Sequence, residues 1–277
     1  MNSLNCNGRL LNLDVPKVMG ILNVTPDSFY DGGKYKTIDS ALQKVGEMIN
    51  NGASIIDIGG MSSRPGAEII DVEEESKRIL PILGEIARTY PEIIISIDTV
   101  HGEIAQRAID NGASIINDIS GGAIDSTIWK VAKDNNVPYI LMHMKGTPNM
   151  MQSNPSYEDV VLDILKYLRD KIFELRNQGL IDIVIDPGFG FGKTINQNYK
   201  ILKRLSSFKI LECPILVGLS RKSMVYEFLN INSLEALNGT TAMHMVALQN
   251  GTKILRVHDV KEAVECVKIH LKLDEEI

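Results

Sequence analysis

The sequence predicts an α/β protein, a single-domain (β/α)8 barrel, from a repeated motif and from a strict alternation of apolar runs with amphipathic segments. The motif is Asn-Gly followed by a short apolar run, and it begins at Asn51, Asn111 and Asn250. Asn-Gly suits the end of a helix because both residues tolerate a left-handed backbone. Each run is too short for a helix and suits a strand buried on both faces. Each copy therefore indicates a helix that leads into the next strand of an α/β unit.

The elements follow one another regularly along the chain. Residues 1–16 are polar, and we expect them to form an N-terminal extension, an appendage with a small hairpin around Leu10 to Leu13. Residues 17–277 are expected to form the barrel. Its expected strands are 18–23, 54–59, 93–98, 114–119, 139–144, 183–186, 214–219 and 254–258. Its expected helices are 38–50, 73–89, 101–110, 126–135, 157–178, 197–208, 235–249 and 261–272. An open doubly wound sheet is the alternative, but the glycine-rich dinucleotide turn is absent after the first strand.

Composition limits the classes of function. A formal net charge of −6 disfavours nucleic-acid binding, so any bound anion must meet local basic groups. The three cysteines have no CxxC spacing, which favours a reducing compartment. The first sixteen residues contain no apolar core of a signal peptide, and no run reaches the ~18 apolar residues of a membrane span. We expect a cytoplasmic protein that contacts neither membrane nor nucleic acid.

Polar side chains follow nearly every expected strand, where a barrel of this type carries its chemistry. Asp57, Asn117 and Arg256 occupy equivalent positions, six residues after the asparagine of each repeat. Polar residues at one repeated depth of buried strands are costly unless a ligand or partner satisfies them. We therefore expect these three side chains to face one shared site.

Two kinds of polar group can be distinguished at this rim. Four side chains are hydrogen-bonding groups that could bind the paired N–H donors of a flat, nitrogen-rich heterocycle held between Met142 and Phe191. They are Asp57, Asp98, Asn117 and Asp186. Four others are cationic and suit a multiply charged anion such as diphosphate: Arg64, Lys222, Arg256 and His258. Asn23 is a neutral oxygen ligand for a magnesium ion.

Several residues also have simpler interpretations. For Asp118 and Asp259, a role as a helix cap alone is as consistent with the sequence as a role in the site. We interpret His143, which lies between two methionines, as structural, and His244 as a packing residue or a subunit contact. Gly-Lys-Thr at 192–194 is similar to the end of a phosphate-binding loop, but Pro187 stands where that loop needs glycine, which disfavours nucleotide hydrolysis.

Five motifs resemble those of the dihydropteroate synthase family, and the likeness extends from Val18 to the last expected helix. They are residues 21–33, 57–67, 186–193, 220–223 and 256–259. The resemblance implies a (β/α)8 barrel, usually a homodimer, that condenses 6-hydroxymethyl-7,8-dihydropterin diphosphate with 4-aminobenzoate. The reaction releases diphosphate and uses Mg²⁺. Sulfonamide analogues of 4-aminobenzoate are expected to inhibit it.

The resemblance also implies roles for individual residues. Asp98, Asn117, Asp186 and Lys222 would bind the pterin ring, Met142 and Phe191 would pack beside it, and Asp57 would support this polar cluster. Asn23, Arg64, Arg256 and His258 would hold the diphosphate and its magnesium. Phe29, Ser63, Pro65 and Ser223 would shape the 4-aminobenzoate pocket. Catalysis is expected to depend on Asp98, Lys222 and Arg256. The sequence departs from the family at Met61, where many members carry glutamate, and at Tyr30, where serine is common.

Two other functions remain open from the sequence. A pterin-binding barrel that passes a folate methyl group to a corrinoid protein would share the polar pterin cluster but has no use for a diphosphate site. A non-catalytic pterin-binding barrel or scaffold would have lost its rim residues, and here the rim is intact apart from Met61. The cationic group at the rim favours the synthase.

Overall fold

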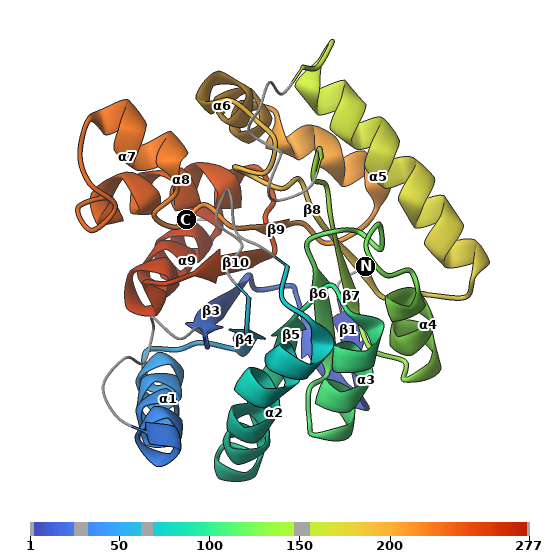
Figure 1. Cartoon of the computed structure of the whole chain (residues 1–277). Helices are drawn as coiled ribbons and strands as arrows, with labels where there is room; N and C mark the ends of the chain where they lie inside the picture. Colours follow the sequence, from blue (N-terminus) through green and yellow to red (C-terminus); the bar gives the residue numbers. More distant parts are fainter. Residues whose placement is uncertain (1–2, 25–32, 62–68, 147–155, 276–277) are drawn as a thin grey trace.

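The computed structural model describes residues 3–24, 33–61, 69–146 and 156–275. Within these ranges, eight parallel strands form the centre of the molecule and helices surround them (Figure 1). The expected (β/α)8 barrel is therefore confirmed. No helix in the described ranges has the length and apolar character that a membrane span requires.

The strands lie close to their expected positions. They are β3 Lys17–Asn23, β4 Ile55–Gly59, β5 Ile94–Asp98, β6 Ile115–Asp118, β7 Tyr139–Met142, β8 Ile183–Asp186, β9 Leu216–Val217 and β10 Ile254–Val257. Their order in the sheet is β8-β7-β6-β5-β4-β3-β10-β9. Strand β9 is much shorter than the expected 214–219, and Pro214 cannot donate a ladder hydrogen bond. An isolated parallel bridge between Ile185 and Ile215 joins β8 to this segment and closes the barrel.

The helices differ from expectation mainly between β8 and β10. They are α1 Gly33–Asn50, α2 Val72–Thr89, α3 Gly102–Asp110, α4 Thr127–Asp134, α5 Val160–Asn177, α6 Ile195–Lys203, α7 Ser223–Leu229, α8 Leu237–Gln249 and α9 Val260–Asp274. The expected helix 197–208 is wrong in its extent, because α6 ends at Lys203 and a 3-10 helix, η2 Leu205–Leu211, follows. Helix α7 was not expected. It has only seven residues and lacks a side-chain cap, so its sequence signal is weak.

The repeated Asn-Gly corners have the conformation that the sequence predicts. Gly52, Gly112 and Gly251 have φ of +97°, +109° and +96°, in the region that favours glycine. Each corner ends a helix and leads directly into a barrel strand. The repeat is therefore a structural junction that fixes where β4, β6 and β10 begin.

The interior of the barrel can be followed in steps of two residues, because alternate side chains of a strand face the same side. The lower set of interior residues forms one buried apolar cluster at the amino ends of the strands. It consists of Met19, Ile55, Ile94, Ile115, Ile140, Val184, Leu216 and Ile254. This apolar set supports the polar residues that follow two positions later on the same strands.

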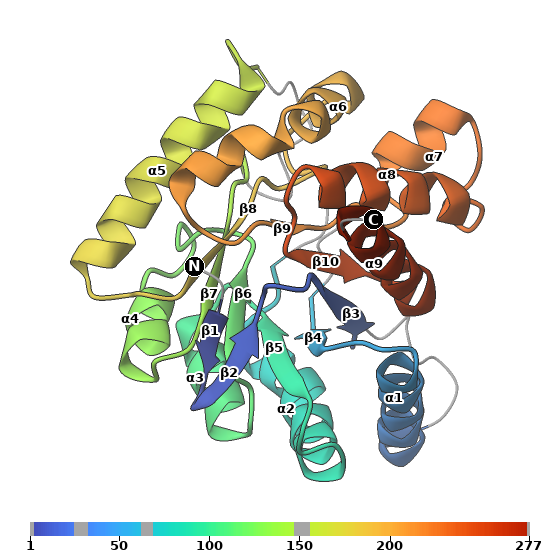
Figure 2. The ribbon, with the colours of Figure 1, turned by 180° about the vertical axis from the view of Figure 1, so that it is seen from behind.

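A hairpin covers the lower set. Strands β1 (Ser3–Cys6) and β2 (Arg9–Asn12) pair antiparallel through a turn at Asn7-Gly8, whose positive φ values of 52° and 86° suit a tight hairpin. The turn therefore lies nearer the N-terminus than the expected position around Leu10 to Leu13. Four apolar residues, Leu4, Cys6, Leu11 and Leu13, join the lower cluster. Figure 2 shows the hairpin across this end of the barrel. It is part of the core and not an appendage.

Candidate active site

The same two-residue step leads from the lower set to the polar rim. Two residues further along each strand lies a middle set: Ile21, Asp57, Ser96, Asn117, Met142, Asp186, Gly218 and Arg256. Two further lies an upper set: Asn23, Gly59, Asp98, Ile119, Met144, Gly188, Ser220 and His258. Most of the rim residues expected from the sequence fall in these two sets. The carboxyl ends of the parallel strands therefore bring them to one end of the barrel.

A hydrogen-bonded network around Asp57 joins the three residues of the repeated motif. The carboxylate of Asp57 is fully buried, and its Oδ2 accepts hydrogen bonds from Asn117 Nδ2 at 3.0 Å and from Arg256 Nε at 2.6 Å. Arg256 Nη2 also donates to Asp98 Oδ2 at 2.5 Å. Asp57, Asn117 and Arg256 therefore lie together, as expected, and their role in a shared site stays a prediction. Arg256 bridges two carboxylates from neighbouring strands and is held in a fixed orientation.

The charges in this network are strongly coupled. Burial raises the pKa of Asp98 to about 7, although the Arg256 guanidinium opposes the shift and Asp57 adds to it. Burial lowers the pKa of Arg256, but the two carboxylates outweigh burial and the net shift is upward. Arg256 therefore remains a cation, and the pKa of Asp98 lies above the usual value for an aspartate.

A second group lies at the ends of β8 and β9. Burial raises the pKa of Asp186, which also accepts the backbone N–H of Gly188 at 2.7 Å, and Lys222 opposes the shift. The ammonium of Lys222 donates to the backbone carbonyl of Phe189 at 2.5 Å and lies 4.9 Å from the ring centroid of Phe191. Burial lowers the pKa of Lys222 to about 8, while Asp186 favours its charged form. Asp186 and Lys222 thus form a polar edge beside an aromatic ring.

An apolar patch adjoins these polar groups. Met142 and Phe191 are buried and pack in one cluster with Met61, Val100 and Ile119. The expected role of Met142 and Phe191 in holding a flat ring stays a prediction. Met61, the departure from the family pattern, contributes a buried apolar side chain to the same cluster. No carboxylate stands at that position, and the patch is correspondingly more apolar.

His258 requires a correction. It was expected to be cationic, but desolvation and the nearby Arg256 guanidinium lower its pKa to about 4, even though the residue is exposed at the rim. The imidazole is therefore neutral at neutral pH, and its Nδ1 lies 3.2 Å from the hydroxyl of Ser220. A bound anion would favour the protonated ring, because a nearby negative charge raises the pKa of histidine. Among the described residues of the expected anion site, Arg256 carries the permanent charge.

Other expected site residues are distributed around this rim. Asn23 is the last residue of β3 and is half-buried, and Ser223 is the first residue of α7. Phe29, Ser63, Arg64 and Pro65, together with Tyr30, lie outside the described residues. The described part of the expected site comprises the Asp57 network, Asp186, Met142, Phe191, Lys222, Asn23, His258 and Ser223.

The simpler interpretations can be tested by geometry. Asp118 is structural, but it accepts from the backbone N–H groups of Ser120 and Gly122 and from the Tyr139 hydroxyl rather than capping a helix. Asp259 is at the N-cap of α9 and makes no capping hydrogen bond; its two oxygens accept from Arg221 at 2.8 Å each. Arg221 thereby ties the loop after β9 to the loop after β10.

The two histidines with structural interpretations are both buried. Burial lowers the pKa of His143 to about 2 and that of His244 to about 4, so both rings are neutral at neutral pH. The ring of His143 packs edge-on against Tyr167, with centroids 4.9 Å apart. These features support packing roles for both residues and leave the subunit contact of His244 untested.

Lys193 explains why the Gly-Lys-Thr segment does not act as a phosphate-binding loop. Its ammonium is buried and donates to the backbone carbonyls of His143, Gly188 and Phe191 at 3.2, 2.7 and 2.9 Å. Burial lowers its pKa well below the usual value. These hydrogen bonds stabilise the conformation of the loop after β8 and so position Phe191. The ammonium of Lys193 is buried and is not accessible to a ligand.

Sequence reasoning missed two buried polar residues near the network. Ser96 is in the middle set beside Asp57, and in the described structure its hydroxyl has no hydrogen-bond partner. The sequence signal for Ser96 is its position two residues before Asp98, which places both side chains on the same face of the strand. Glu75 on α2 is fully buried, and burial raises its pKa to about 7. It lies in an acidic first turn of α2, a pattern typical of a solvated helix N-terminus, and the sequence gives no clear sign that it turns inward.

The described residues do not form a metal centre from side chains alone. Among them, no three His, Cys, Asp or Glu side chains gather in a way that could hold a metal ion. Asn23 offers one neutral oxygen at the rim, in the upper set that includes His258. Magnesium commonly takes one or two protein oxygens and completes its coordination with water and substrate phosphates. The donors present therefore fit a magnesium ion that arrives with a diphosphate, and not a cage of protein ligands.

The fold and the site together define a barrel of the class that carries its polar groups at the carboxyl ends of the strands, here a buried network with an arginine at the rim. The chain belongs to the pterin binding enzyme family, whose model matches residues 19–258. It is 43% identical over 268 residues to the dihydropteroate synthase of Escherichia coli K12, covering 95% of this chain and 93% of the relative. The resemblance seen in the sequence is confirmed.

Solved structures agree with this family. The Xanthomonas albilineans dihydropteroate synthase with 4-aminobenzoic acid is 36% identical, with a TM-score of 0.92 and coverage of 100% of this chain and 99% of that one. The same enzyme has been solved with 7,8-dihydropteroate, at a TM-score of 0.89, 35% identity and coverage of 99% and 100%. The Yersinia pestis dihydropteroate synthase in a sulfonamide drug complex is 39% identical, with a TM-score of 0.90 and coverage of 98% of both chains.

Proposed function

We propose that the protein catalyses the condensation of 6-hydroxymethyl-7,8-dihydropterin diphosphate with 4-aminobenzoate, the dihydropteroate synthase reaction. The observation that carries this proposal is the buried network of Asp57, Asn117, Asp98 and Arg256 at the carboxyl end of a family barrel. Relatives with the same fold are named for this reaction and have been solved with 4-aminobenzoic acid and with 7,8-dihydropteroate. The reaction is a transfer with C–N bond formation.

The pterin ring is proposed to bind against the polar side of the rim. The carboxyl groups of Asp98 and Asp186 accept hydrogen bonds from the N–H donors of the ring edge, and Asn117 supplies a further polar contact. Lys222 donates to a ring acceptor, while Met142 and Phe191 pack against the ring face. Asp57 does not need to touch the ring, because its Oδ2 already orients Asn117 and Arg256.

The chemical step follows from the charges that develop. The nitrogen of 4-aminobenzoate attacks the pterin methylene carbon, the C–O bond to diphosphate breaks, and its electron pair leaves with the diphosphate oxygen. The amine then loses a proton. Arg256 stabilises the growing negative charge from a fixed orientation, with Arg64 and His258 proposed beside it. The amine is uncharged at neutral pH, so it needs positioning by Phe29, Ser63, Pro65 and Ser223 more than a general base.

Magnesium, assembly and location complete the proposal. Asn23 would hold Mg²⁺ together with diphosphate oxygens, and the ion would neutralise charge on the leaving group. A homodimer is proposed through α7 and α8, where Phe228, Leu229 and Val246 expose apolar side chains, with Leu234 between the helices 80% exposed. Three cysteines without disulfides fit the reducing cytoplasm.

Diphosphate release tests the function directly. We expect release with both substrates and Mg²⁺, little release with either substrate alone, and formation of 7,8-dihydropteroate in equal amount. A sulfonamide should compete with 4-aminobenzoate, as the relative solved with such a drug suggests. The rival function would give methyl transfer from a methylated folate to a corrinoid protein without diphosphate release. That result would overturn the proposal.

A further inference from the structure

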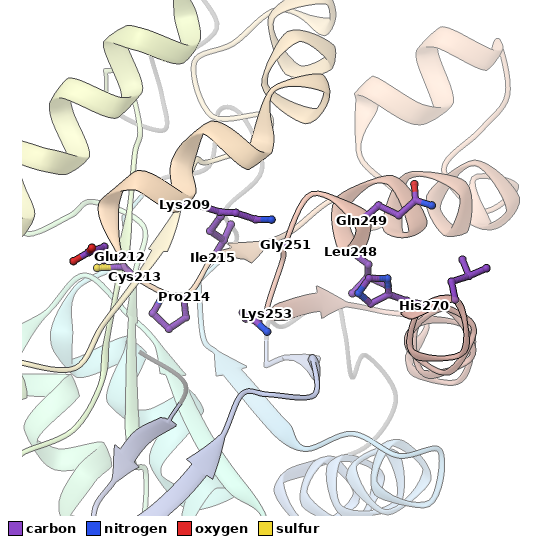
Figure 3. A pocket seen from close by; sticks show the side chains of 11 residues that line it. Lys209, Glu212, Cys213, Pro214, Ile215, Leu248, Gln249, Gly251, Lys253 and His270 are labelled. Atoms are coloured by element: carbon purple, nitrogen blue, oxygen red, sulfur yellow. The ribbon is translucent and has the colours of Figure 1, made fainter. Parts of the chain in front are cut away.

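A cavity lies far from the rim, beside the segment that leads into β9 and beside the start of β10. Its volume is about 450 Å³, within the range of small-molecule sites. Figure 3 shows side chains from η2, α8 and α9 converging on it. The residues that line it are Lys209, Glu212, Cys213, Pro214, Ile215, Leu248, Gln249, Gly251, Lys253, His270 and Leu273. None of them belongs to the proposed active site.

The cavity is located at the third of the three repeated Asn-Gly corners, and this corner differs from the other two. A Cβ built on Gly52 would meet the side chain of Val264, and one on Gly112 would meet that of Ala87. At Gly251 the corresponding space holds the end of Lys209, with Cε 2.0 Å and Nζ 2.7 Å from the built Cβ. Two corners are covered by apolar side chains and the third by an ammonium.

The charges around the cavity favour an anion. Lys209 and Lys253 line it with His270, and Glu212 is the one acidic side chain among the lining residues. In the part of the chain that the structure describes, neither lysine ammonium makes an ion pair or a side-chain hydrogen bond. Arg176 adds a further cation just outside, because its Nη2 lies 3.7 Å from the Cys213 sulfur. A positive site stands out in a protein with a net charge of −6.

The remaining lining is apolar and buried. Pro214, Ile215 and Leu248 are buried, and Cys213 is 9% exposed. Such a surface suits the hydrocarbon part of a ligand and not a bare inorganic ion. The cations that line the cavity are lysines, which act as point charges and suit a tetrahedral phosphate better than a planar carboxylate, for which arginine is the better match.

We propose that this cavity binds a small organic phosphate monoester, with the phosphate between Lys209 and Lys253 and the apolar part against Pro214, Ile215 and Leu248. The proposal does not depend on the function proposed for the rim. Lys253 immediately precedes β10, so a ligand here would contact the strand that carries Arg256 at its other end.

Phenyl phosphate is a suitable probe, with phenol as its uncharged counterpart. The readout is the alkylation rate of each cysteine by iodoacetamide, measured by peptide mass spectrometry. Cys213 lines the cavity, whereas Cys6 and Cys266 are buried elsewhere and serve as internal references. We expect phenyl phosphate to slow alkylation of Cys213 at least ~5-fold relative to both references, and phenol to have no effect.

Charge removal provides the matched controls. The double variant Lys209→Met, Lys253→Met should lose the protection, and Lys268→Met should keep it, because Lys268 is exposed on α9 and does not line the cavity. A crystal soaked in phenyl phosphate should show the phosphate within hydrogen-bond distance of one of the two lysines. An empty cavity in that crystal, equal protection by phenol, or protection that survives the double variant would each overturn the proposal.

Discussion

Ile55 and Asp57 lie two residues apart on β4 and both belong to the barrel interior, yet their surroundings have opposite character. Ile55 is part of the lower apolar set, which the hairpin β1–β2 covers. Asp57 is part of the polar network, with Asn117 and Arg256 as its partners. The same contrast holds between Ile254 and Arg256 on β10. One end of the barrel thus holds the fold together, and the other carries the chemistry.

The two ends also differ in how much they contribute to the free energy of unfolding. Burying apolar side chains at the lower end contributes about 1.5–3 kcal/mol for each large residue. The buried ion pairs at the upper end contribute little net stability, because desolvation of the charges offsets most of their attraction. Keeping Asp57, Asp98 and Arg256 in the interior is therefore explained better by function than by stability.

The largest expected effect is at the upper end, at Arg256. Arg256→Met should lower kcat/KM for the pterin diphosphate by about 10³-fold, because it removes the fixed charge that faces the leaving group. It should also cost about 3 kcal/mol of unfolding free energy, because Asp57 and Asp98 lose their partner. Diphosphate-release kinetics and denaturant titration measure the two effects. Arg256→Lys keeps the charge and should recover part of the stability. Unchanged kinetics in Arg256→Met would contradict the assignment of catalysis to the upper end of the barrel.

The next effect belongs to the lower end. Leu4→Ala in the hairpin should reduce the unfolding free energy by about 3 kcal/mol, since Leu4 is fully buried against the lower set. The kcat of the folded protein should remain unchanged, because Leu4 belongs to the lower apolar cluster, whose members among the described residues include none of the expected site residues. Leu10→Ala is the matched control on the same hairpin, as Leu10 is 77% exposed, and it should have almost no effect. A large loss of kcat in Leu4→Ala would contradict the separation of the two ends.

A smaller, pH-dependent effect is expected at Glu75, a carboxyl buried outside the barrel interior. Burial raises its pKa to about 7 from 4.5, so the folded state binds its proton more tightly than the unfolded state does. Its contribution to stability is therefore full below pH 4.5 and is lost as the pH rises towards 7. Glu75→Gln removes this loss. The unfolding free energy of the variant relative to that of wild type should therefore be higher at pH 8 than at pH 5, by about 2 kcal/mol.

Urea titrations of wild type and variant at the two pH values measure this difference. Glu73→Gln is the control, because Glu73 is exposed in the same first turn of α2. The same pH slope in wild type and Glu75→Gln would show that folding does not raise the pKa of Glu75.

The smallest effect is expected at an ion pair that belongs to neither end. Arg204 Nη1 and Asp159 Oδ2 are 2.8 Å apart, and both side chains are exposed. Arg204→Met should change the unfolding free energy by less than about 1 kcal/mol, because water screens the pair. Thermal denaturation at low and high salt measures this. A loss as large as that in Arg256→Met would show that the location of an ion pair does not determine its importance.

The sequence predicted the barrel and much of the rim because both follow from local periodicity. The repeat placed Asp57, Asn117 and Arg256 at one depth, and the structure joins them by hydrogen bonds. The short helix α7 and the inward turn of Glu75 were missed, since each depends on packing between elements distant in the chain. The cationic state expected for His258 did not allow for desolvation, which lowers its pKa and is not visible in the sequence, or for Arg256 two residues earlier, which lowers it further.

The hairpin has a further consequence for how the chain is made. The backbone N–H of Asn5 donates to the carboxylate of Asp182, a residue 177 positions later. The apolar side chains of β1 and β2 also share one cluster with residues of β8, β9 and β10, the last strands to be synthesised. During translation these side chains are therefore exposed until the last strands have left the ribosome. Contacts of such long separation form slowly. The hairpin is among the first elements synthesised and among the last to be buried. The amino end of the nascent chain therefore exposes apolar side chains that a chaperone can bind.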